Sequence, residues 1–80
     1  MISVRQVKAA RALLGWSQDE LAAKSGVSKP TVARLETADG ELGGYAGTRD
    51  KLVAALESAG VIFVEENGEG PGVRLRKKRK

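Results

Sequence analysis

The chain has 80 residues, a formal net charge of +4, no cysteine and no histidine. This length suits one small domain, and the missing residue types exclude disulfides, thiolate zinc sites and histidine-based catalysis. No apolar run reaches the length of a signal peptide or a membrane-spanning helix, so we expect a cytoplasmic protein with no membrane contact.

The positive charge is distributed unevenly along the chain. Residues 1–35 carry a net +4, residues 36–73 a net −6 and residues 74–80 a net +6. The high isoelectric point therefore comes from the last seven residues. Basicity of the whole chain is consequently no argument for nucleic-acid binding; the asymmetry between its parts is the informative feature.

A first helix is predicted from about Val4, because Ser-Val-Arg-Gln at residues 3–6 is a capping-box sequence. Helical spacing places Val7 and Leu14 against a core. Three basic residues of this helix are expected to stay in water: Arg5, Lys8 and Arg11. Gly15 should end the helix, and Trp16 should fill the core where the next helix begins.

Two short helices joined by a glycine turn are predicted over residues 18–37. Ser17 starts a second capping box, and Gly26 supplies the left-handed backbone position that a sharp turn needs. Ser28 can cap the second helix, with Pro30 in its first turn, where a missing N–H costs little.

The second of these helices is expected to bury Val32 and Leu35 and to expose its opposite face. That face consists of five residues, of which Lys29 and Arg34 are basic: Lys29, Pro30, Ala33, Arg34 and Thr37. An exposed helix with basic side chains at its leading end fits the major groove of DNA.

The segment from Leu13 to Glu36, LLGWSQDELAAKSGVSKPTVARLE, resembles the helix-turn-helix of phage-repressor-like bacterial transcription regulators, the xenobiotic-response-element class. The positions that match the family pattern include Gln18, Ala22, Gly26, Val27, Val32 and Leu35. The resemblance implies a mainly α, lambda-repressor-like fold of four or five short helices. It also implies sequence-specific binding of double-stranded DNA, with the 28–37 helix in the major groove, and regulation of transcription by repression.

Within this motif we expect DNA contacts from Gln18, Ser28, Lys29, Pro30, Thr31, Ala33, Arg34 and Thr37. Arg34 and Lys29 are candidates for base edges or phosphates, and the hydroxyl groups can donate to phosphate. Ser28 has the alternative role of an N-cap alone. Gln18 lies at a helix N-terminus, where free N–H groups favour a phosphate, although the acidic residues that follow it would repel one.

Residues 37–47 contain four glycines and predict a surface loop, with one irregular turn around Leu42 or Tyr45. Thr48 is expected to cap the next helix, which should end at Gly60. We expect the residues up to this glycine, 1–60, to form the DNA-binding domain.

A β-hairpin is predicted for residues 61–76, because Val-Ile-Phe-Val at 61–64 and the alternating residues 73–76 both suit strands. A two-residue turn at Asn67-Gly68 would place Glu66 opposite Glu69, so a longer loop is preferred. Residues 77–80 form a basic tail that we expect to be disordered.

The strand at 61–64 carries apolar side chains on both faces, Ile62 and Val64 on one and Val61 and Phe63 on the other. One face can rest on the helix containing Leu52 and Leu56. A second copy of the chain would cover the other face and the strand edge, which predicts a homodimer; packing of both faces within the monomer is the alternative.

No enzyme activity is expected, and no catalytic residue, metal site or cofactor. The adjacent Glu65 and Glu66 point to opposite faces of a strand end, and neither a phosphate-binding loop nor calcium-loop spacing is present. Two further interpretations remain: an antitoxin that also binds a protein toxin, and an interaction module whose helix-turn-helix no longer binds DNA.

Overall fold

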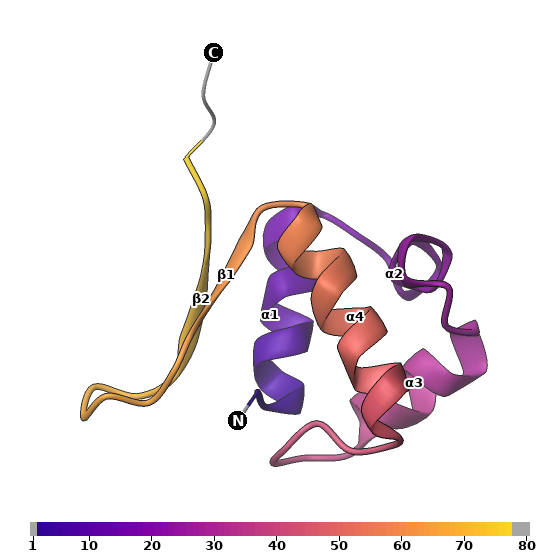
Figure 1. Ribbon diagram of the computed structural model, residues 1–80, viewed down its shortest axis with the longest axis horizontal. Helices are drawn as coiled ribbons and strands as arrows, with labels where there is room; N and C mark the ends of the chain where they lie inside the picture. Colours follow the sequence, from indigo (N-terminus) through magenta and orange to yellow (C-terminus); the bar gives the residue numbers. More distant parts are fainter. Residues whose placement is uncertain (1, 78–80) are drawn as a thin grey trace.

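The computed structural model describes residues 2–77. The elements in this part of the chain are four helices followed by an antiparallel hairpin: α1 (Val4–Leu14), α2 (Gln18–Ser25), α3 (Lys29–Thr37), α4 (Ala46–Ser58), β1 (Val61–Val64) and β2 (Gly72–Leu75) (Figure 1). The predicted fold, mainly α with a central helix-turn-helix and a C-terminal hairpin, is confirmed.

The first three helices begin at the predicted serine caps: Ser3, Ser17 and Ser28. Each serine Oγ accepts a hydrogen bond from a backbone N–H three residues later, which satisfies a donor that the helix itself leaves free. At the other ends of α1 and α2, Gly15 and Gly26 adopt φ angles of 70° and 76°. Local sequence alone therefore sets these boundaries.

Gly26→Val should lower the free energy of unfolding by about 1–3 kcal/mol, because a β-branched residue is strained at positive φ. A Cβ at this position would meet no other atom within 4 Å, so the whole effect is expected from the backbone. Thermal melts without DNA measure it. A variant that melts like the wild-type protein would contradict the left-handed turn.

The core is a single cluster to which every helix and β1 contribute: Val4, Val7, Ala10, Leu21, Val27, Val32, Leu35, Leu42, Leu52, Leu56 and Val61. Trp16 packs against this cluster, as its sequence position predicts.

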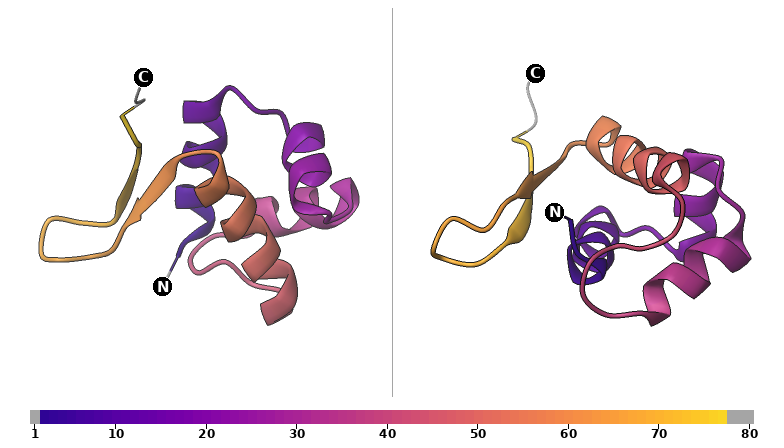
Figure 2. Two further views of the ribbon diagram at one scale, coloured as in Figure 1. Left: turned by 45° about the horizontal axis from the view of Figure 1, so that its top comes forward. Right: turned by 60° about the horizontal axis from the view of Figure 1, so that its bottom comes forward.

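In Figure 2 the hairpin lies beside α1 and α4, on the side away from α2. No helix within residues 2–77 has the length and apolar character needed to cross a membrane.

The hairpin pairs Val61 with Leu75 and Val64 with Gly72, and its loop spans residues 65–71. A long loop was predicted, but β2 begins and ends one residue earlier than the predicted 73–76. Gln6 fastens the loop end of the hairpin to α1: its Nε2 donates to the backbone oxygens of Val64 and Gly72, at 3.1 and 3.0 Å. The Gln6 side chain therefore helps to cap α1 and also holds the hairpin against this helix.

The loop between α3 and α4 is held to the N-terminal residues. The N–H of Leu42 donates to the oxygen of Ile2 at 3.0 Å, and the Leu42 side chain is buried. The prediction that Thr48 caps α4 is wrong: α4 begins at Ala46, with Tyr45 as its N-cap residue. Thr48 is the third residue of α4 and therefore lies in its first turn.

Candidate nucleic-acid interface

The outer face of α3 carries the residues that the sequence assigns to DNA contact. Val32 and Leu35 are buried beneath the helix. Four predicted contacts on the opposite side are exposed: Lys29, Pro30, Arg34 and Thr37. Thr31 and Ala33 are half-buried at the margins of this face. The structure thus brings all six of these α3 residues to one surface or its edge.

Arg34 and Lys29 differ in their surroundings. Arg34 is exposed and forms no ion pair with any residue between 2 and 77. Lys29 lies with its Nζ 3.4 Å from an oxygen of Asp19, and both side chains are more than half exposed. Such an exposed pair contributes little stability and is easily exchanged, so Lys29 can leave Asp19 for a phosphate.

The hydroxyl groups at the ends of α3 already have partners within the chain. The Ser28 Oγ accepts from the N–H of Thr31 and donates to the Thr31 Oγ1 at 2.9 Å. The Thr37 Oγ1 donates to the backbone oxygen of Arg34 at 2.7 Å. Contact with a phosphate would require these protons to turn away from their present acceptors. Ser28 acts as an N-cap, the alternative role that the sequence left open for it.

A polar network joins the two helices of the motif to α1. The Arg11 guanidinium donates to both carboxylate oxygens of Glu36, at 2.8 and 2.7 Å, and to the backbone oxygen of Trp16. The Gln18 Nε2 donates to the same carboxylate at 2.9 Å. The expectation that Arg11 stays in water is wrong, because it forms a bidentate pair with a side chain that is 3% exposed.

Burial alone would raise the pKa of Glu36. Hydrogen bonds from Arg11 and Gln18, together with the charge of Arg11, outweigh that effect and hold the pKa below its ordinary value. Glu36 is therefore ionised at neutral pH and fixes the end of α3 against the start of α2. Gln18, a predicted phosphate contact, uses one amide proton in this network and retains the other.

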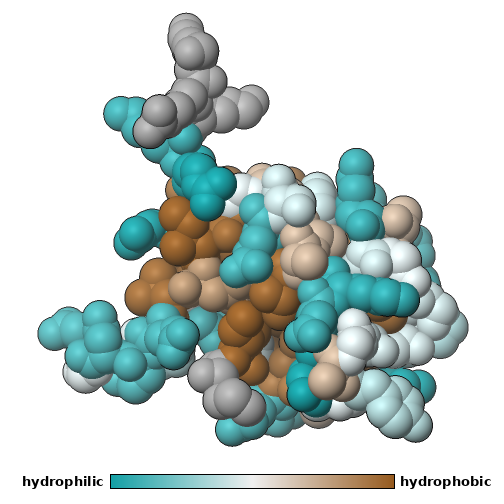
Figure 3. All heavy atoms as spheres, in the orientation of Figure 1, coloured by the Kyte–Doolittle hydropathy of each residue, from teal (hydrophilic) through white to brown (hydrophobic). Residues whose placement is uncertain are grey.

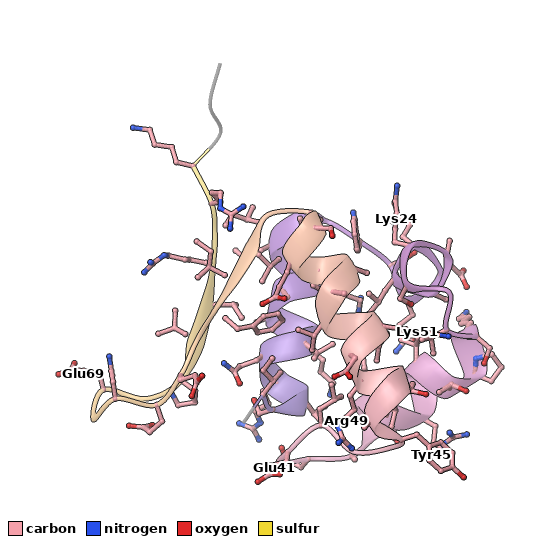
Figure 4. All side chains as sticks on the ribbon, viewed as in Figure 1. Lys24, Glu41, Tyr45, Arg49, Lys51 and Glu69 are labelled. Carbon is pink, nitrogen blue, oxygen red and sulfur yellow. The ribbon has the colours of Figure 1, made fainter. Side chains whose placement is uncertain are left out.

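Tyr45 extends the candidate interface beyond α3 and was not among the predicted contacts. Its side chain is 85% exposed, and it lines a groove of about 300 Å³ together with Thr31, Arg34 and Thr48. Figure 4 shows Tyr45 at the beginning of α4. A lone aromatic residue between glycines in the sequence GGYAG was the available signal, but the exposed position depends on where the loop ends.

The described side chains offer no metal centre: within residues 2–77 no three His, Cys, Asp or Glu side chains gather as ligands. What the geometry does define is a helix-turn-helix with an exposed, cationic second helix. That arrangement is the DNA-reading element of a large class of regulators.

Residues 7–44 match the family model Helix-turn-helix, of the Cro/C1 or phage-repressor-like type. The match includes α2 and α3, the turn between them and most of α1. The match supports a DNA-binding helix-turn-helix regulator of this type. The family is one of DNA-binding regulators and not of enzymes. A comparison with curated proteins finds no match.

Proposed function

We propose that the protein is a transcriptional repressor that binds a specific double-stranded sequence as a homodimer, with α3 in the major groove. The observation that carries the proposal is the outer face of α3, where Arg34 is exposed beside Tyr45 and has no acidic partner within residues 2–77. An arginine in this position can donate two hydrogen bonds to the O6 and N7 of guanine.

The remaining predicted residues would serve to orient α3. Lys29 can reach a phosphate by leaving Asp19, and Gln18 has a free amide proton at the N-terminus of α2. Pro30 and Ala33 offer only apolar contact, which suits the methyl group of thymine. Base preference is therefore expected to depend on Arg34 more than on any other residue of α3.

Arg34→Ala should cost about 1–3 kcal/mol of specific affinity and relax base preference at one position in each half-site. The control is deletion of Lys77–Lys80, which should weaken all duplexes alike and flatten the salt dependence. Residues 78–80 of this basic tail lie outside the described residues. Quantitative gel-shift titrations on the selected site and its single-base variants separate these effects. If Arg34→Ala alters neither affinity nor preference, α3 is not reading bases in this way.

Selection of bound duplexes from a random library tests the proposal as a whole. A specific regulator yields a consensus sequence, and a homodimer yields two inverted half-sites about one helical turn apart. Placing that site over a promoter should then reduce transcription in a purified system when the protein is added. A chain that enriches no sequence would be a scaffold whose helix-turn-helix no longer reads DNA.

The homodimer is supported by the apolar face of β1 that no other part of the described chain covers fully. Val61 is buried and Phe63 packs against the core, but Ile62 and Val64 lie on the other face of β1 and are only half-buried. A two-stranded sheet rarely stands alone in water. A second chain on this side would cover that face and would present two recognition helices to a palindromic site.

A further inference from the structure

A groove lies between α2 and α4, away from the outer face of α3. It has a volume of about 490 Å³ and is lined by Trp16, Lys24, Ser25, Lys51, Ala54, Ala55, Ser58 and Ala59. The walls are small side chains and one indole, so an inserted segment could approach the helices closely. Lys24 and Lys51 are exposed, and neither forms an ion pair with any residue between 2 and 77. The groove therefore favours an anionic occupant.

The hairpin loop, residues 65–71, contains three glutamates and no basic residue, and it projects from the body of the molecule (Figure 1). The Glu66 carboxylate accepts hydrogen bonds from the N–H groups of Gly68 and Gly70, at 2.8 and 3.1 Å. These bonds shape the loop and leave Glu65 and Glu69 exposed, with no ion pair to any described residue. A loop with this internal order loses little conformational freedom when it binds.

The loop cannot reach the groove of its own chain. Figure 4 shows Glu69 at the far end of the hairpin, while Lys24 and Lys51 lie on the opposite side of the molecule. The views in Figure 2 agree, because α2 and the hairpin loop are separated by α1 and α4 in both. Any contact between these complementary charges must therefore join two molecules.

We propose that the hairpin loop of each chain docks in the α2–α4 groove of a second copy, with Glu65 and Glu69 facing Lys24 and Lys51. The inference rests on the proposed homodimer and names the surfaces that form it. A two-fold axis makes the exchange reciprocal, so each dimer contains two identical loop-in-groove contacts and the assembly closes.

The surface between the loop and the groove suits the centre of such an interface. Figure 3 shows hydrophobic side chains gathered over the hairpin strands and continuing across the middle of this face. The outer face of β1 supplies two half-buried apolar residues, Ile62 and Val64. An apolar centre between charged margins is the usual anatomy of a protein interface. Exposed ion pairs contribute little affinity but fix which surfaces meet, so the apolar centre supplies affinity and the charges supply register.

A charge exchange tests this docking without DNA. Lys24→Glu/Lys51→Glu makes the groove acidic, and Glu65→Lys/Glu69→Lys makes the loop basic. Each double variant alone should dimerise about tenfold more weakly than the wild type in sedimentation equilibrium at low salt, because like charges then meet at both contacts. An equimolar mixture should recover dimerisation to within about threefold, because each loop then faces a groove of opposite charge.

The matched control for the groove variant is Lys8→Glu/Arg76→Glu, which changes the net charge by the same amount at two exposed residues outside the groove, the loop and the outer face of α3. It should leave dimerisation unchanged. Circular dichroism melts verify that every variant is folded.

If the double variants dimerise as strongly as the wild type, the proposed docking is wrong, although the homodimer can still be right. A wild-type monomer at about 100 μM would overturn the homodimer itself, with duplex binding as a separate readout. A groove variant that stays dimeric but loses duplex affinity would show that the lysines bind phosphate instead.

Discussion

Replacing Arg11 with methionine is expected to lower the free energy of unfolding by on the order of 3 kcal/mol. The substitution leaves Glu36 charged, with a side chain that is 3% exposed, and only Gln18 to hydrogen-bond it. Breaking a buried pair from one side costs far more than the pair contributes, because the remaining charge has lost its compensation. Urea denaturation of the two proteins measures the difference.

The control is the double variant Arg11→Met/Glu36→Leu, which removes both charges and should recover much of the loss. If the single variant costs less than about 1 kcal/mol, Glu36 must reach water by a rearrangement, and the network is not structural. Because Glu36 is close to the start of α2, the same measurement shows how firmly the two motif helices are held together.

The stability of the wild-type protein should also depend on pH because of the Arg11–Glu36 pair. The pKa of Glu36 is lower in the folded protein than in the unfolded chain. Its contribution to stability is therefore fully present above the unfolded value, about 4.3, and is lost as the pH falls through the lower folded value. Arg11→Met should remove this part of the acid sensitivity, which melts between pH 6 and pH 3 would reveal.

Truncation after Gly60 is the second change with a large expected effect, about 3 kcal/mol or more of unfolding free energy. It removes Val61, which is 1% exposed in the core, and Phe63 and Val73, which pack against the core. Burial of one such apolar side chain contributes about 1.5–3 kcal/mol. Thermal and urea melts of the truncated chain give the loss.

Leu75→Ala serves as the comparison, since this side chain is 41% exposed and its loss should cost less than about 1 kcal/mol. The predicted boundary at Gly60 depends on the result. A truncated chain that melts like the full one would show that residues 1–60 fold independently of the hairpin; we expect the opposite.

Predictions that depend on neighbouring residues succeeded best. The caps at Ser3 and Ser17 and the turn at Gly26 need only the chemistry of three or four consecutive residues, and each lies where the sequence places it. The hairpin was also predictable in kind, because a run of β-branched residues and a turn segment leave few other structures for it.

Predictions failed where a side chain meets a distant partner. Arg11 was expected in water because the helical spacing of Val7 and Leu14 placed it on the solvated side of the first helix, whereas its partner Glu36 is 25 residues away. The start of α4 at Ala46 has no side-chain cap to mark it in the sequence. Tyr45 was not among the predicted contacts because its place beside Arg34 depends on where the loop before α4 ends, which the sequence GGYAG does not fix.

The hydrogen bonds from Gln6 to the hairpin bear on the order in which the chain folds during its synthesis. The oxygens that accept from its amide belong to residues 58 and 66 positions further along the chain. The first helix therefore meets the partners of this side chain only after the last strand has been synthesised. Before that point α1 can pack against α3 and α4, but the two hydrogen bonds from Gln6 to the hairpin cannot form. Closure of this contact is accordingly a late event in the synthesis of the described fold, and it joins α1 to both strands of the hairpin.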